Sequence, residues 1–115
     1  MDENKFNDLI HELLDQTKTG KLRWQETADS NTFHIIVGEH MIRLEKEVTG
    51  GEPFFSLVLM DRQGRTIIDG LYILNDKQTE WLRELHAYVR ETTKKTKEKA
   101  IDSVLSALKS GHEAR

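Results

Sequence analysis

Residues 32–48 have the sequence TFHIIVGEHMIRLEKEV, and this stretch decides the fold. Two runs that alternate apolar with polar residues flank a Gly38-Glu39 pair, and a two-residue turn with glycine first is typical of a β-hairpin. The turn predicts a register that pairs Val37 with His40, Ile35 with Ile42, Phe33 with Leu44 and His34 with Arg43. One face of the hairpin is then apolar. A slip by one residue would bring Arg43 and Glu45 onto that face, so the pattern specifies the register.

The elements before the hairpin follow from the period of the apolar residues. One helical face is apolar at the start of the chain, which predicts a helix at about 4–18 that Gly20 ends in the left-handed conformation. The period then changes to two at Leu22 and Trp24, which predicts a strand. Residues 28–31 have turn chemistry.

The segment after the hairpin continues the strands. The sequence predicts a loop at Val48–Pro53 with a Gly50-Gly51 pair, followed by a strand at 54–60. A turn at 61–64 then leads to a strand at 65–69. Residues 70–74 either extend that strand or link it to the next helix. Short turns between consecutive strands indicate an antiparallel meander.

A long helical pattern closes the chain. Asn75 or Asp76 suits its N-cap, and no Gly or Pro interrupts residues 76–110. Its first apolar stripe comprises Trp81, Leu82, Leu85, Tyr88 and Val89. As one rod the helix would be about 50 Å long, so it either projects from the body or bends. Thr92, Thr93 and Thr96 are poor helix formers and mark the expected bend.

These elements predict the α+β class. The expected architecture is an N-terminal helix, an antiparallel meander of about five strands, and a long or bent C-terminal helix packed on the sheet. We expect one domain, with a core at 1–99 and an amphipathic helical extension and tail at 100–115.

Composition restricts the function classes. Hydrophobic residues make up 37% of the 115 residues and charged residues 32%, and cysteine is absent, which excludes thiol catalysis and thiolate metal sites. The absence of cysteine, the acidic polar N-terminus and the short apolar runs predict a cytoplasmic protein with no membrane association. Residues 1–75 hold 13 acidic and 8 basic side chains (net −5), whereas residues 76–115 hold 7 and 9 (net +2). An acidic body argues against a broad nucleic-acid surface.

The start of the chain resembles a loose group of small uncharacterised bacterial proteins. The shared pattern is Leu-Leu-x-x-Thr-x-x-Gly-Lys-Leu-x-Trp, here Leu13, Leu14, Thr17, Gly20, Lys21, Leu22 and Trp24. An Asp-x-x-Gly turn at Asp61 and Gly64 and an Ile/Leu-rich final segment complete it. The resemblance implies the architecture and no site, because its motifs form the fold.

Candidate catalytic and metal-ligating residues form no constellation. The register places His34 and His40 on opposite faces, so they cannot share a metal ion, and we expect neither metal nor cofactor. Of the remaining histidines, His11, His86 and His112, none has a neighbour in sequence that would tune it for proton transfer. The pair Glu45 and Glu47 is typical of a solvated strand face. The serines lie in no nucleophile elbow, and the Gly50-Gly51 pair lacks the Lys-Ser/Thr of a phosphate loop.

Two aromatic residues and one basic run have alternative interpretations. Trp24 and Trp81 could form a binding platform, but each falls on the apolar face of its element, which favours core packing. Arg90, Lys94 and Lys97 share a helical stripe that could contact phosphate, but a solvated helix face is the commoner reason for such a run.

A second apolar stripe follows the basic run and carries the functional hypothesis. Ile101, Val104, Leu105 and Leu108 have the spacing of one helical face, and a free amphipathic segment this short is marginal in water. We expect it to dock, either back on its own body or on a second subunit, and the acidic body and basic tail favour self-association. The sequence thus favours a non-enzymatic interaction or regulatory module. One alternative is a small-ligand or enzymatic module that uses the loop at 48–53 and the exposed sheet face. The other is a weak nucleic-acid binder through residues 90–99.

Overall fold

The computed structural model describes residues 3–69 and 76–111, and it confirms the predicted α+β class. Its elements, in chain order, are α1 (Glu3–Lys18), β1 (Gln25–Glu26), β2 (Thr32–Val37), β3 (His40–Thr49), β4 (Glu52–Met60), β5 (Thr66–Asp69) and α2 (Asp76–Lys109). The strands form one antiparallel sheet in the order β1-β2-β3-β4-β5, which is the predicted meander.

The register of the β2–β3 hairpin is the predicted one. Phe33 pairs with Leu44, Ile35 with Ile42, and His34 with Arg43. The four apolar members of these pairs are buried, and β4 continues their face with Phe55 and Leu57. The alternation of β2 and β3 therefore directs one sheet face toward a core.

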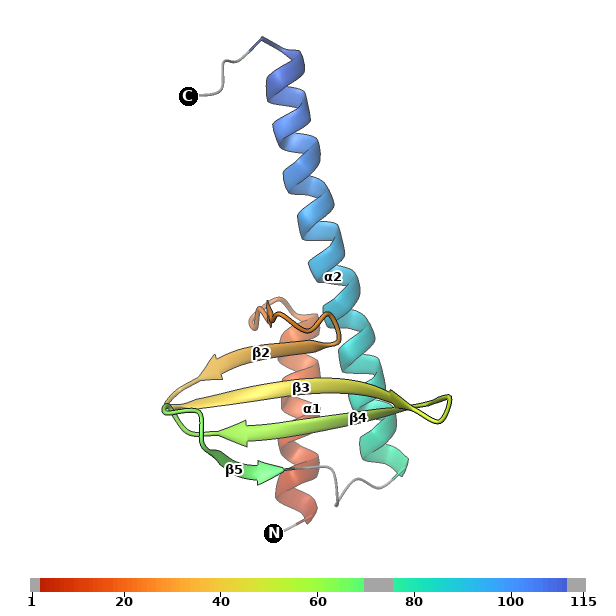
Figure 1. Cartoon of the computed structure of the whole chain (residues 1–115). Coiled ribbons are helices and arrows are strands. Elements are labelled where there is room, and N and C mark those ends of the chain that lie inside the picture. Colours follow the sequence, from red (N-terminus) through yellow and green to blue (C-terminus); the bar gives the residue numbers. More distant parts are fainter. Residues whose placement is uncertain (1–2, 70–75, 112–115) are drawn as a thin grey trace.

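Both helices cover that same face (Figure 1). They run parallel to each other, because Asn7 lies beside Gln78 and Lys18 beside Glu84 at the other end of α1. The buried hydrophobic cluster joins the sheet to both helices and comprises Phe6, Ile10, Leu13, Leu14, Trp24, Phe33, Ile35, Ile42, Leu44, Phe55, Leu57, Leu82, Leu85 and Val89.

The first strand is shorter than predicted. Leu22 and Trp24 precede the ladder, and only Gln25–Glu26 pair with β2. Gly20 (φ 80°) ends α1 as expected, and the chain then turns the Trp24 ring into the core. The indole Nε1 donates a 2.9 Å hydrogen bond to Thr17 Oγ1, so a tertiary contact of the ring replaces strand pairing.

The predicted loop at Val48–Pro53 is wrong. Val48 pairs with Pro53 and Thr49 with Glu52, so β3 and β4 continue to a two-residue turn made of Gly50 and Gly51. Both glycines have positive φ (64° and 87°), the conformation that a tight hairpin turn with this twist requires.

The predicted turn after β4 is confirmed. Gly64 N donates to Asp61 O at 3.0 Å, and the Asp61 carboxylate accepts hydrogen bonds from the backbone N–H groups of Gln63 and Arg65. The turn leads directly into β5.

The helix α2 is a single unbroken helix of 34 residues, so the bend expected at Thr92–Thr96 is absent. The hydroxyls of Thr92, Thr93 and Thr96 donate to carbonyls four residues earlier in the helix, which accommodates them without a break. The C-terminal half of α2 projects from the body (Figure 1), and the molecule measures 58 × 35 × 25 Å. Residues 70–74, the N-cap candidate Asn75 and His112 lie outside the described residues.

Candidate functional site

The projecting end of α2 presents the predicted apolar stripe, residues Ile101, Val104, Leu105 and Leu108, which we call the seam. Their side chains are 59%, 59%, 45% and 53% exposed. At about 100° per residue, the seam is turned by about 110° around the helix axis from the face of Leu82, Leu85 and Val89 that packs on the core. The seam therefore faces away from the core face rather than extending it.

The projecting segment is amphipathic, with one apolar side and one polar side. Ala100 and Ala107 border the seam, whereas Asp102, Ser103 and Ser106 occupy the opposite face. Every residue from 98 to 109 is exposed, and none forms a hydrogen bond or ion pair with the described part of the body. One expected alternative was that this segment folds back on its own body. In the structure it does not.

The three basic residues of the predicted phosphate stripe share the direction of the seam. Arg90, Lys94 and Lys97 precede Ile101 at helical spacings of four and three residues, so one face of α2 is basic at 90–97 and apolar at 101–108. Lys97 Nζ forms an ion pair with Glu26 Oε2 at 2.7 Å, where α2 leaves the body. This ion pair engages one of the three cations that a phosphate contact would need.

A groove of about 640 Å³ lies in the corner between the upper body and α2. Its lining residues are Thr17, Gly20, Leu22, Arg23, Trp24, Gln25, Glu26, Tyr88, Val89, Thr92, Thr93, Thr96 and Lys97. The threonine hydroxyls donate to the carbonyls of their own helices, and Trp24 is buried rather than presented as a platform. The groove contains no nucleophile paired with a base.

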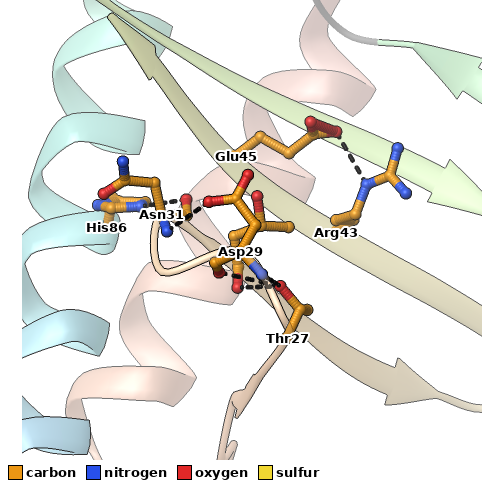
Figure 2. Close-up of polar contacts among 7 residues, drawn as sticks. Thr27, Asp29, Asn31, Arg43, Glu45 and His86 are labelled. Carbon is orange, nitrogen blue, oxygen red and sulfur yellow. Dashed lines mark hydrogen bonds and ion pairs between the residues drawn. The ribbon is translucent and has the colours of Figure 1, made fainter.

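The residue that the sequence analysis missed is His86, which is 2% exposed. Figure 2 shows its ring beside the loop that precedes β2, where Nε2 lies 2.8 Å from the carbonyl oxygen of Asn31. Because a carbonyl oxygen only accepts, Nε2 carries the proton and donates. Edge contacts to Phe33 and Phe55 hold the ring on both sides. Its position four residues after Leu82, on the buried stripe, was the available signal.

The loop that meets His86 is fixed by its own polar side chains (Figure 2). Thr27 Oγ1 accepts from the backbone N–H of Asp29 at 3.1 Å, and Asp29 Oδ1 accepts from that of Asn31 at 2.9 Å. The Asn31 carbonyl oxygen also accepts from the backbone N–H of Lys46 at 3.1 Å. His86 thus fastens α2 to a preorganised loop, which is a structural role.

Burial lowers the pKa of His86 from its ordinary value of 6.5, and the charges of Lys46 and Arg90 lower it further. The hydrogen bond to Asn31 acts in the opposite direction but does not dominate. No carboxylate approaches the ring among its described contacts, so the site lacks a partner that would make His86 a proton shuttle.

The enzymatic alternative would need a cleft in which Glu52 of the 48–53 segment meets His40 of the hairpin, and these two residues lie far apart. His40 begins β3 and Glu52 pairs with Thr49 at its other end, roughly 30 Å away at about 3.4 Å per residue, so no cleft joins them. His34 and His40 keep opposite faces of the hairpin. Arg43 binds Glu45 at 2.9 Å on the uncovered face (Figure 2). Within residues 3–69 and 76–111, no three His, Asp or Glu side chains are grouped as metal ligands.

Two further apolar surfaces flank the sheet. Ile36, Met41 and Met60 form a cross-strand row on the sheet face opposite the helices, where Ile36 is 68% exposed and Met60 is buried. A cavity of about 280 Å³ lies between the start of α1 and strands β3 to β5, with Phe6 and Ile68 among its walls. Neither surface contains a polar group that would orient a small ligand, apart from Lys5 at the cavity.

Comparisons with known proteins gave no match to a family model, a curated protein or a solved structure. None of the described helices is both long and apolar enough to cross a bilayer. The function is therefore argued from the geometry of the chain itself.

Proposed function

We propose that the protein is a non-enzymatic interaction module that self-associates through the projecting end of α2. The observation that carries the proposal is the seam, four half-exposed aliphatic side chains on a helical segment that the described body leaves uncovered. The projecting end of α2 has no packing against the described body, so a second helix on the seam would stabilise both.

A second copy suits the seam better than a charged partner surface does. The seam is entirely aliphatic, and its polar opposite face remains hydrated when two seams meet. Soluble oligomers are mostly symmetric and use the same patch on both subunits. The net charge of −5 on residues 1–75 disfavours contact between two bodies, which leaves the basic and apolar α2 as the contact element.

The size of the seam limits the affinity. Covering the exposed part of each side chain contributes about 1 kcal/mol, or about 8 kcal/mol for both copies, before an association cost of about 4–15 kcal/mol. The pair is therefore weak and depends on protein concentration.

The test is light scattering over a concentration series up to about 1 mM, where an association free energy of about −4 kcal/mol, the most favourable value that these figures allow, gives substantial dimer. The full chain should rise in mass toward twice its 13.4 kDa. A truncation after Lys99 and a Val104→Asp variant should stay monomeric, whereas Ser106→Asp, on the opposite face, should associate like the parent.

The melting temperature of dilute protein serves as the folding control. All core residues precede Lys97, so neither variant should lower it by more than a degree or two. A full chain that is monomeric at the highest concentration would show that the seam is not a self-association surface.

A further inference from the structure

We infer that two copies pair through α2 in antiparallel orientation, with the two bodies at opposite ends of the pair; this rests on the proposed self-association. The first reason is the spacing within the seam. The intervals between Ile101, Val104, Leu105 and Leu108 are three, one and three residues, the same in both directions along the helix. A two-fold axis near Val104 and Leu105 thus superposes apolar positions on apolar positions, so an antiparallel pair buries the seam as fully as a parallel pair in register would.

The second reason is the charge that precedes the seam on the same face. A parallel pair in register would place Lys94 against Lys94 and Lys97 against Lys97 of the second copy, and like charges at facing positions are destabilising. An antiparallel pair centred on the seam moves each basic segment beyond the end of the apolar contact. The basic half of the face therefore selects the orientation, and this gives Arg90, Lys94 and Lys97 a role that needs no phosphate.

The third reason is steric. The body contacts one side of α2 up to Lys97, which is held to Glu26, while the 12 residues from 98 to 109 have no contact with the described part of the body. An antiparallel pair needs contact only along this uncovered length. A parallel pair brings two acidic bodies side by side at the base of the helices.

Pulsed electron paramagnetic resonance on a spin-labelled variant tests the orientation. The chain has no cysteine, so Glu91→Cys, on an exposed position of α2, gives one defined label per copy. With the axis near Val104 and Leu105, two Glu91 positions lie about 40 Å apart along an antiparallel pair, whereas parallel helices hold them within about 20 Å. We expect the longer distance at a concentration where light scattering detects the dimer.

The control is the same label in the Val104→Asp background, where the 40 Å distance should disappear. A distance within about 20 Å in a dimeric sample overturns the antiparallel orientation and leaves self-association intact. A sample that light scattering finds monomeric at every concentration refutes the self-association itself, and the inference with it.

Discussion

His86 is a titratable side chain that the fold keeps neutral. Its ring makes edge contacts with Phe33 and Phe55, and among the described residues its polar contact is to the backbone carbonyl of Asn31, which also accepts from the backbone N–H of Lys46. Burial opposes protonation of the ring, and the nearby charges of Lys46 and Arg90 oppose it further. A single residue thereby makes the stability of the whole domain depend on pH.

The direction of this dependence follows from the lowered pKa. The unfolded chain takes up a proton at His86 near pH 6.5, before the folded chain does, so stability falls as the pH decreases below about 6.5. The fall ends once the pH is below the folded pKa, and its slope is at most about 1.4 kcal/mol per pH unit. Denaturant unfolding between pH 7.5 and about 5.5 measures it.

The matched variants are His86→Gln, whose amide can still donate to Asn31, and His40→Gln on an exposed position. We expect His86→Gln to be less stable at neutral pH, because it loses both ring contacts, and to lose the pH dependence between 7.5 and about 5.5. His40→Gln should keep the dependence of the parent. An unchanged slope in His86→Gln would show that another group is responsible.

Local sequence patterns explain why His86 was missed. The partner of the ring, Asn31, lies 55 residues earlier, and no local period contains a contact of that range. By contrast, the roles of Trp24 and Leu82 in the core follow from the apolar faces of their elements, and the structure confirms both.

At the scale of elements, the β2–β3 hairpin provides a direct test of register. Ile35 is 6% exposed against the core, while its neighbour Ile36 is 68% exposed on the other sheet face. Ile35→Asp should unfold the protein, because it buries an unpaired carboxylate. Ile36→Asp makes the same chemical change one residue away and should cost about 0.5 kcal/mol or less. Far-ultraviolet circular dichroism and urea unfolding distinguish the two, and equal stability of both variants would contradict the register.

The hairpin was predictable and its neighbours were less so, for physical reasons. A Gly-Glu turn between these runs has one register that places Phe33, Ile35, Ile42 and Leu44 together on the buried face, whereas Gly50 and Gly51 fit either a flexible loop or a tight turn. Because Val48 pairs with Pro53, the structure has the tight turn. This pairing depends on the twist of the strands, which the apolar period of the sequence does not show. Likewise, the threonines of α2 are poor helix formers, but their hydroxyls bond to the helix itself and the helix continues.

The seam was predicted as an apolar face, but its direction required the structure. Spacing alone shows that Ile101 and Leu108 share a face. Their turn of about 110° from the core face, and the absence of a bend, together place that face away from the body. These two facts separate an exposed apolar face from an extension of the core.

At the scale of the whole molecule, the projecting helix determines the shape. The radius of gyration is 17.0 Å, whereas a compact domain of this length would have about 13 Å. Small-angle scattering of dilute protein should therefore show an elongated particle. Of the residues that the structure describes, truncation after Lys99 removes only exposed ones, so it should shorten the particle while the melting temperature is kept.

Small-angle scattering of concentrated protein reports on the assembly independently of any label. Two molecules of 58 Å that overlap along about 18 Å of helix give an antiparallel pair with a maximum dimension of about 100 Å. A parallel pair would stay near the length of one molecule and become thicker instead. We expect the maximum dimension to grow with concentration in the parent and in Ser106→Asp, and to stay constant in Val104→Asp. Growth in mass without growth in length would favour the parallel arrangement, in which Lys94 and Lys97 of one copy face the same residues of the other and repel them. Raising the salt concentration screens this repulsion, so it would strengthen a parallel pair and leave an antiparallel pair almost unchanged.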